Sequence, residues 1–529
     1  MSTIYDAIII GAGHNGLVTA AYLARAGRSV LVLERRELLG GCAVTEELWP
    51  GFKVSTASYV NSLFRPEIIR DLELKRHGFE MLPRNPSSFT PFPDGRYLLM
   101  GPDKEMTHRE VAKFSRRDAD ALPRYEAMLE RVADFLEPTL VQTPPNPWSM
   151  APRNLLALLR LGLGFRRLGR DGQKAVEILT GAANPILDRW FESEEVKATI
   201  ATDAIIGAFA TPSMPGTAYV LFHHVMGECD GVRGVWGYVR GGMGGLSNAI
   251  ASAAREGGAE IKTSAPVARI LIKGGRAYGV AMQDGVEYHG RKVVSGVDAN
   301  VTFLKLMDPA ELPAEFADSV RHLDYASGSC KINLALSEVP DFACLRGNTP
   351  GPQHRGTIHL CPTREYIERA FDQAKYGYIS DNPIIEATIP SSLDDTVAPR
   401  GRHVMSMFTQ YFPYRLAADA GTLEDNKTRY AERCIDIMTE YAPNFRKAVI
   451  DYQVLSPADL ESRFSLTGGN IMQGTMSLSS LSFMRPVPGY ADYRTPIKGL
   501  YLCGAATHPG GGVMGACGYN AAREILRDG

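Results

Sequence analysis

The sequence has no long hydrophobic run, no paired cysteines and no excess of one charge. No window of about 18 uninterrupted apolar residues occurs in it, so we expect no membrane-spanning helix. A formal net charge of −2 gives no general attraction to nucleic acid, and we expect no nucleic-acid partner. The eight cysteines are scattered without a CxxC pair or a histidine cluster beside them, which argues against a disulfide framework and against a metal site.

A secretory leader is not expected either. The apolar run at residues 7–10 is too short for the hydrophobic region of a signal peptide before glycines interrupt it. We therefore expect a reducing, cytoplasmic compartment. With 529 residues, 45% of them apolar and 22% charged, the chain is a globular protein long enough for two or three domains.

The strongest local signal is the stretch YDAIIIGAGHNGLVTAAYLARAGRSVLVLE at residues 5–34. It reads as a buried strand, a glycine turn, a helix over residues 14–26 and a second buried strand at residues 29–33. Strand, turn, helix and strand in this order form one βαβ unit, which is the setting that a dinucleotide-binding motif requires.

The residues for such a site stand at the expected spacing. Gly11, Gly13 and Gly16 have GxGxxG spacing, for the tight turn, for the approach of a pyrophosphate and for close packing of helix on strand. The free N–H groups of the helix N-terminus would hold the phosphates. Glu34 stands at the end of the second strand, where an acid accepts hydrogen bonds from a ribose.

Later segments return to this pattern. Residues 234–255 read as a strand, a glycine-rich turn and a small-residue helix, and short strands are predicted at residues 259–262, 266–272, 276–282 and 292–296. At the end of the chain a strand at residues 497–503 precedes a helix over residues 513–526. A nucleotide domain that is closed by the C-terminal segment fits a flavoprotein better than a nicotinamide dehydrogenase.

The fold class that we predict is therefore α/β. A Rossmann-type doubly wound FAD-binding domain, formed by residues 1–70, 225–301 and 489–529, is interrupted by a mixed-sheet α+β substrate domain of residues 71–224 and 302–488. In the substrate domain we expect a hairpin at residues 84–100, a helix over residues 116–137, and strands at residues 331–336, 383–389 and 403–411. Residues 45–60 are predicted to be irregular.

Residues 152–170, PRNLLALLRLGLGFRRLGR, interleave leucines with five arginines. This pattern is typical of an amphipathic helix that lies on an anionic membrane surface, and it also fits a core-packed helix with arginines on its solvated side. Peripheral membrane contact thus stays open from the sequence, as does assembly into a homo-oligomer.

Three segments resemble a known family: GAGHNGL near the start, RGGMGGL at residues 240–246 and LYLCGAATHPGGGVMGACGYNAA at the end. They are similar to the FAD-dependent bacterial-type phytoene desaturases, relatives of carotenoid isomerases and retinol saturase in the flavin amine-oxidase-like superfamily. IPSSLDDTVAPRGRHVMSMFTQYFPY, GGNIMQGTMSLSSL and FMRPVPGY resemble the phytoene-dehydrogenase-related, pyridine-nucleotide-disulfide-oxidoreductase-domain-containing branch. The resemblance covers nearly the whole chain, and no motif in it is specific for a substrate.

The resemblance implies FAD as cofactor. Its ADP half would lie on the opening glycines and Glu34, while Gly41 would pass close to the pyrophosphate and the backbone of Val267 would contact the adenine side. Gly504 would hold the ribityl and isoalloxazine portion, and the helix starting near Gly515 would direct its positive end toward the charge that develops on the reduced flavin. Many relatives have arginine where this chain has Cys42, so backbone donors must replace that phosphate contact.

Three side chains are candidates for catalysis. His508, in the HPGGG loop, is the best candidate for a general acid or base, and Arg485 and Gln473 follow as a charge partner and a polar positioning group. For all three, structural roles are at least as well supported. The methionine-rich and phenylalanine-rich residues 405–408, 472–476 and 483–484 fit either an apolar substrate cavity or an ordinary core.

The function that we predict is FAD-dependent dehydrogenation, or desaturation, of a lipophilic and isoprenoid or carotenoid-like substrate by hydride transfer to flavin N5. Three alternatives remain: a flavin amine oxidase, a flavin-dependent double-bond isomerase, and a flavin-stabilised interaction protein with little turnover.

Overall fold

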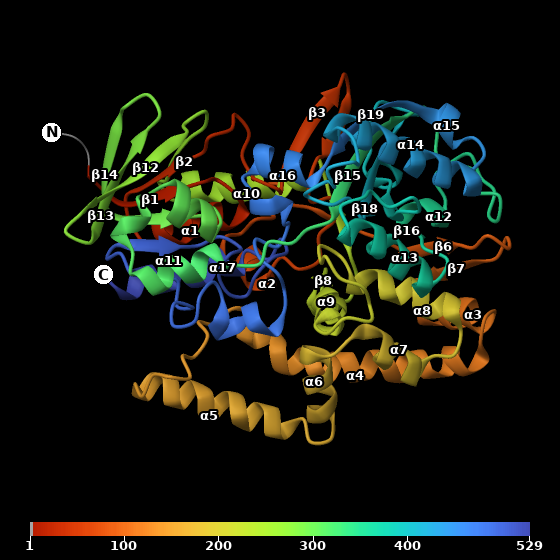
Figure 1. Cartoon of the computed structure of the whole chain (residues 1–529), viewed down its shortest axis with the longest axis horizontal. Helices are drawn as coiled ribbons and strands as arrows, with labels where there is room; N and C mark the ends of the chain where they lie inside the picture. Colours follow the sequence, from red (N-terminus) through yellow and green to blue (C-terminus); the bar gives the residue numbers. More distant parts are fainter. Residues whose placement is uncertain (1–3) are drawn as a thin grey trace.

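Two β-sheets organise the chain in this computed structural model, which describes residues 4–529 (Figure 1). In the first sheet the strand order is β11-β2-β1-β14, all parallel, and β20 pairs in parallel with the end of β14. The beginning of β14 pairs instead with β13, which continues antiparallel to β12. The strands are β1 Ile4–Ile10, β2 Val30–Leu33, β11 Glu260–Lys262, β12 Val267–Lys273, β13 Arg276–Met282, β14 Glu287–Ser295 and β20 Leu500–Leu502. The predicted α/β class with a discontinuous nucleotide-binding sheet is confirmed.

Three helices pack beside one another on this first sheet: α1 His14–Arg25, α10 Met243–Glu256 and α17 Ala516–Arg527. The small and apolar side chains of α1 are buried against the strands, as the GLVTAAYLA pattern predicts. α1 ends where Gly27 adopts a φ of 75°, and its N–H is bonded to the carbonyl of Ala24.

The last helix lies directly on the first. A Cβ on Gly518 would stand 2.1 Å from the carbonyl oxygen of Asn15, so only glycine permits this approach. The hydroxyl of Thr19 donates to the carbonyl of Gly518 at 3.1 Å. The two ends of the chain therefore meet beside the opening glycine turn.

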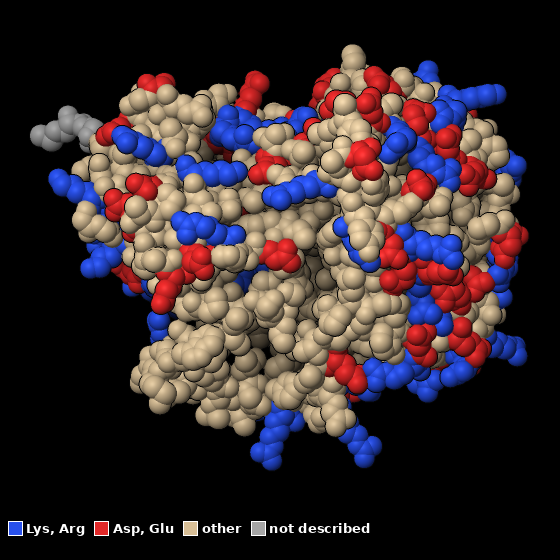
Figure 2. Space-filling model, viewed as in Figure 1, with Lys and Arg blue, Asp and Glu red and all other residues tan. Residues whose placement is uncertain are grey.

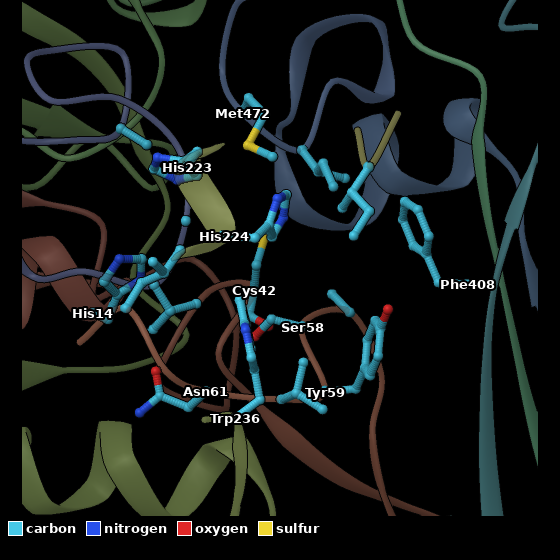
Figure 3. A pocket seen from close by; sticks show the side chains of 18 of the residues that line it. His14, Cys42, Ser58, Tyr59, Asn61, His223, His224, Trp236, Phe408 and Met472 are labelled. Carbon is cyan, nitrogen blue, oxygen red and sulfur yellow. The ribbon is translucent and has the colours of Figure 1, made fainter. Parts of the chain in front are cut away.

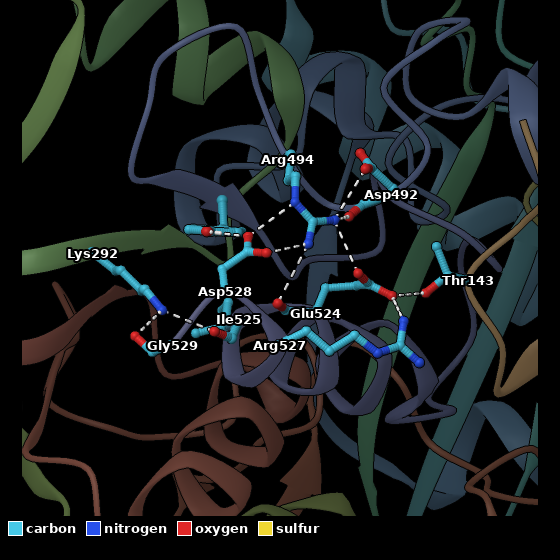
Figure 4. A network of polar contacts seen from close by, with 10 residues as sticks. Thr143, Lys292, Asp492, Arg494, Glu524, Ile525, Arg527, Asp528 and Gly529 are labelled. Carbon is cyan, nitrogen blue, oxygen red and sulfur yellow. Dashed lines mark hydrogen bonds and ion pairs between the residues drawn. The ribbon is translucent and has the colours of Figure 1, made fainter. Parts of the chain in front are cut away.

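Ion pairs anchor the C-terminal helix to the first sheet (Figure 4). Arg494 bonds to Asp492, Glu524 and Asp528, and Glu524 is fully buried. Lys292, on β14, donates to the carbonyl of Ile525 at 2.8 Å. Because Glu524 also pairs with Arg527, its buried charge is compensated from two sides.

The second sheet has the order β19-β15-β18-β17-β16-β6-β7, and every pair in it is antiparallel except β16 with β6. Its strands are β6 Ser88–Pro91, β7 Tyr97–Met100, β15 Ser329–Leu336, β16 Thr357–Leu360, β17 Ile384–Thr388, β18 His403–Gln410 and β19 Val449–Leu455. The hairpin and the three strands predicted for this part of the chain are confirmed. The domain boundaries at residues 70, 225, 301 and 489 stay a prediction.

Helices cover the second sheet. The long helix α4 begins after Ser115, whose hydroxyl accepts from the N–H of Asp118. Together with α3 and α6 to α9 it lies below the second sheet in the view of Figure 1. The helices here are α3 Lys104–Ala112, α4 Arg116–Leu140, α6 Asp171–Thr180, α7 Ala183–Trp190, α8 Glu194–Ala201, α9 Thr217–His223, α13 Arg364–Lys375, α14 Leu423–Tyr441 and α16 Pro457–Phe464.

One prediction of irregular structure is wrong. Residues 45–60 contain an antiparallel pair, β3 Thr45–Trp49 and β4 Phe52–Ser55. Pro50 and Gly51 form the turn between the two strands, with Gly51 at a φ of 80°. This Pro-Gly dipeptide is the turn signal that could have predicted the hairpin.

The amphipathic segment forms the helix α5 Pro152–Arg167, which contains no buried residue. Figure 1 shows α5 as an outlying helix at the lower edge, and Figure 2 shows an uncharged surface there with basic side chains projecting below it. Across residues 4–529 we find no helix that combines the length and the apolar character needed to cross a membrane.

Candidate active site

A cavity of about 860 Å³ extends from the glycine turn of the first sheet to the inner face of the second sheet. The first sheet contributes the carboxyl ends of β1, β2 and β14, where ligands of open α/β sheets bind. The second sheet contributes residues of β15, β16, β17 and β18. Figure 3 shows part of the lining, with His14 and Cys42 on one side and Phe408 on the other.

The glycine turn has the shape that a pyrophosphate needs. Gly11 has a φ of 90°, and a Cβ on Gly16 would stand 2.2 Å from the carbonyl oxygen of Gly11. A Cβ on Gly13 would meet no atom within 4 Å, so this glycine borders open space. Helix α1 has neither a side-chain cap nor an acidic residue in its first turn, which leaves its N–H groups free for an anion. All three glycines that were predicted from the motif surround this turn.

Glu34 is held in place by the backbone. One carboxylate oxygen accepts from the N–H of Ala12 at 2.8 Å and the other from the N–H of Arg36 at 2.9 Å. Glu34 is buried and lines the cavity, and each of its oxygens keeps a lone pair for a ribose hydroxyl. Val267, at the start of β12, lies in the same wall. The assignment of both residues to the ADP half stays a prediction.

Two glycine turns approach each other at the cavity. Gly41 has a φ of 58°, and its Cβ position is 3.2 Å from the Cα of Gly13. The next residue, Cys42, lines the cavity, and burial raises the pKa of its thiol to about 12. Because the thiolate is the nucleophilic form, this thiol is poorly suited to covalent flavin attachment.

Two arginines that no sequence motif indicated belong to this part of the lining. Arg36 and Arg463 both line the cavity, and both bond to the same oxygen of Glu46, at 2.6 and 2.7 Å. Arg36 places positive charge near Cys42, at the turn where the family resemblance led us to expect an arginine. Since Arg463 lies on α16, 417 residues after Glu46, no local pattern could have connected them.

The C-terminal segment reaches the cavity through Ala505, Gly512 and Val513. Helix α17 begins three residues later at Ala516, so its positive end lies close to the lining. Gly504 and Gly515 have packing constraints of their own. A Cβ on Gly504 would stand 2.5 Å from the carbonyl oxygen of Gly296, and one on Gly515 would stand 2.9 Å from Phe64 and from Ile68. Neither glycine belongs to the cavity lining, and their contacts with the flavin stay a prediction.

The predicted catalytic role of Arg485 is not supported by its placement. Its guanidinium is buried and donates to the carbonyl oxygens of Met472, Gln473, Thr475, Ser480 and Ala505. These bonds join the loop after residue 470 to the C-terminal loop. Gln473, by contrast, lines the cavity, and its side-chain oxygen accepts from the N–H of Ala506 at 3.0 Å. We assign Arg485 a structural role, while a positioning role for Gln473 stays a prediction.

His508 also has a structural environment. Its Nε2 bonds to the carbonyl oxygen of Thr139 at 2.9 Å, and its own carbonyl accepts from the hydroxyl of Tyr493 at 2.8 Å. Burial lowers the pKa of His508 to about 4, so the imidazole is neutral near pH 7. A histidine bonded to a loop carbonyl outside the cavity lining is a poor general acid or base, because it does not reach the substrate space.

The substrate side of the cavity contains residues that the sequence could not place. His223, His224 and Trp236 line it, and the rings of His224 and Trp236 pack with centroids 5.7 Å apart. Tyr59 and Phe408 stack at 6.3 Å (Figure 3). Of the methionines and phenylalanines proposed for an apolar cavity, Phe408 and Met472 belong to the lining, whereas Met405, Met407 and Met476 are buried in the hydrophobic core.

The sheet order, the glycine turn and the cavity define an α/β protein of the dinucleotide-binding class. Residues 16–375 match the family model of flavin-containing amine oxidoreductases, and the chain belongs to this family. It is 47% identical to pyridine nucleotide-disulfide oxidoreductase domain-containing protein 2 of Rattus norvegicus, over 99% of this chain and 94% of that protein. It is 24% identical to phytoene desaturase of Fusarium fujikuroi, over 98% and 89% of the two chains. The family resemblance expected from the motifs is confirmed.

A solved structure agrees on the fold. Cyclohexylamine oxidase from Brevibacterium oxydans IH-35A superposes with a TM-score of 0.57, at 17% identity and with 99% of both chains covered. The cofactor of this chain is FAD. The open space at Gly13, the uncapped start of α1 and the oriented carboxylate of Glu34 fit its diphosphate and ribose.

Proposed function

We propose that this flavoprotein dehydrogenates a lipophilic substrate of isoprenoid or similar character. The observation that supports this proposal is the extent of the cavity, which continues beyond the dinucleotide turn into the substrate domain. Its walls there are largely apolar and aromatic, and include Leu122, Leu129, Leu221, Trp236 and Phe408. A long pocket with such walls favours an extended apolar molecule.

Bound FAD supplies the hydride acceptor, at its N5 atom. The chain binds and orients the substrate between the apolar walls, which keep water out of the space. His223 borders the C-terminal loop, since a Cβ on Gly512 would stand 3.2 Å from its Nε2. Burial lowers the pKa of His223 to about 3, so it is a neutral imidazole that can donate or accept one hydrogen bond near the reacting carbon.

Amine oxidation is a second candidate, and one observation favours it. Tyr59 and Phe408 face each other as a stacked pair on the cavity wall, and Trp236 lies in the same lining. Aromatic faces attract cations, so they would also suit an amine substrate.

Anaerobic titration of the purified yellow protein tests the proposal. A substrate that is dehydrogenated should bleach the flavin absorbance near stoichiometry, and its product should be lighter by two hydrogen atoms. Turnover without bleaching and with an unchanged product mass would instead identify an isomerase. If neither polyenes nor amines change the flavin spectrum and no product forms, the interaction protein with little turnover becomes the better explanation.

A further inference from the structure

Four cavity residues stand in one row across the second sheet. The strand register pairs Lys331 on β15 with Phe408 on β18, Phe408 with Glu386 on β17, and Glu386 with His359 on β16. Directly paired residues in neighbouring strands point to the same side of a sheet, and all four line the cavity. The sheet thus presents an amine, an aromatic ring, a carboxyl group and an imidazole side by side.

Further polar groups face this row from other elements. The hydroxyl of Thr202 bonds to Nδ1 of His359 at 3.1 Å, which ties the short helix η1 Thr202–Ala204 to the sheet. Asp203, which follows Thr202 in the chain, lines the cavity. It is close enough to Glu386 to help raise the pKa of the Glu386 carboxyl group. Arg84 also lines the cavity and is held by the hydroxyl of Thr357 at 2.8 Å.

Lys331, His359 and Arg84 each bond to a hydroxyl group, of Ser406, Thr202 and Thr357 respectively, whereas the carboxyl group of Glu386 is less well paired. Glu386 is 4% exposed, and its partner at ion-pair range is His359 Nδ1, 3.7 Å away. In the same cavity His223 is 2% exposed, and no side chain in the described part of the chain is bonded to either of its ring nitrogens. Buried polar groups are costly unless they are bonded, so such an arrangement indicates a ligand that completes it. A pure hydrocarbon could not do so.

We propose that Glu386 and Asp203 receive the polar head of an otherwise apolar substrate. The head is a hydrogen-bond donor, either a hydroxyl or an ammonium group, because the two carboxyl groups can accept such bonds. Phe408, Tyr59 and Trp236 would contact the apolar body. This inference rests on the proposed function and narrows its substrate class from lipophilic molecules in general to amphipathic ones.

The test compares three probes of equal chain length, octylamine, 1-octanol and octane, on the FAD-loaded protein. Binding is measured by equilibrium dialysis at equal free concentration, which requires neither turnover nor a spectral change. We expect octylamine or 1-octanol to bind at least about tenfold more tightly than octane, as one hydrogen bond in a buried site would give. The probe that binds better tells whether the natural head is an ammonium or a hydroxyl group.

Variants test whether Glu386 and Asp203 cause the preference for the head-bearing probe. Glu386→Gln and Asp203→Asn should each reduce the preference for the head-bearing probe about tenfold and leave octane binding unchanged. Glu365→Gln, on the exposed side of α13, is the matched control and should keep the preference. Equal binding of all three probes by the wild-type protein, or an unchanged preference in both cavity variants, would overturn the inference. If the head preference persists but no substrate bleaches the flavin, the proposed dehydrogenation fails and this inference stands.

Discussion

Glu386 shows at the scale of one residue how the cavity lowers stability. Burial and the neighbouring Asp203 raise the pKa of Glu386 to about 8. In the unfolded chain this carboxyl group has the ordinary glutamate pKa of 4.5. The stability that comes from the protonated form is therefore present below pH 4.5 and is lost as the pH rises to about 8. An ionisable group whose pKa is shifted this far by burial is typical of a binding site rather than of a hydrophobic core.

Substitution of Glu386 by glutamine should reveal this pH dependence of stability. Glutamine stays neutral, so the Tm of Glu386→Gln minus that of the wild type should increase between pH 5 and pH 8 and level off above that range. We expect a rise of about 2 to 5 °C, measured by differential scanning fluorimetry without added substrate. Glu365→Gln should show no such trend. A Tm difference that is constant from pH 5 to pH 9 would show that Glu386 is already ionised at low pH.

Residues of the cofactor turn could be predicted, whereas those of the substrate row could not. Gly11, Gly13, Gly16 and Glu34 lie within one βαβ unit, so their spacing along the chain determines their positions in space. Lys331 and His359 are brought onto one row only by the register of four strands. The sequence contains no local pattern for that register. His508 was a poor candidate for the same reason, since its partner Thr139 lies 369 residues away.

At the scale of elements, helix α5 has an unusual surface. Leu155, Leu156, Leu159 and Leu163 fall on one side of the helix and are between 43% and 58% exposed. Beneath the helix lies a second hollow of about 860 Å³, whose basic side chains come from two helices. These side chains are Arg153, Arg160, Arg523 and Arg527. An apolar side flanked by arginines fits the surface of an anionic membrane.

We expect the purified protein to float with vesicles that contain anionic lipid at low salt, and to float less as salt screens the arginines. The paired change Leu159→Ser and Leu163→Ser should leave the protein in the bottom fraction while its flavin absorbance is unchanged, because α5 contributes no buried residue. A leucine-to-serine change at a buried position such as Leu187 cannot serve as the control, because it would disrupt the core. Wild-type protein that stays in the bottom fraction with anionic vesicles at low salt would refute membrane contact.

The apolar runs of the sequence predict most strands of the second sheet, but they do not predict which strands pair with one another. The strands near residues 331, 384 and 403 are sufficiently regular to predict, whereas the parallel pairing of β6 with β16 joins residues 269 positions apart. The β3–β4 hairpin differs from these pairings because its signal, the Pro50-Gly51 turn, is local, so the sequence alone is sufficient to predict it.

At the scale of the whole molecule, the cofactor site depends on segments from both ends of the chain. Helix α1 supplies an N-terminus without a side-chain cap, where we predict the cofactor phosphates to bind, and the loop before α17 supplies Ala505, Gly512 and Val513 to the cavity. The contact of α17 with α1 and the ion pairs of Arg494 keep these segments together. Asn15, which Gly518 contacts, also lines the cavity, so a change in this contact should be felt at the flavin.

Gly518→Ala tests this coupling. Its methyl group would overlap the carbonyl oxygen of Asn15, so α17 or the first turn of α1 must move. We expect about a tenfold weaker affinity for FAD and a cost of about 1 to 3 kcal/mol in stability, as for other overpacked contacts. The ratio of flavin to protein absorbance after purification, followed by titration of FAD into stripped protein, measures the effect. Gly162→Ala, in α5 with no atom within 4 Å of its Cβ position, is the control and should leave both quantities unchanged or slightly improve stability. Normal flavin content and affinity in Gly518→Ala would show that α1 holds the cofactor without support from the C-terminal helix.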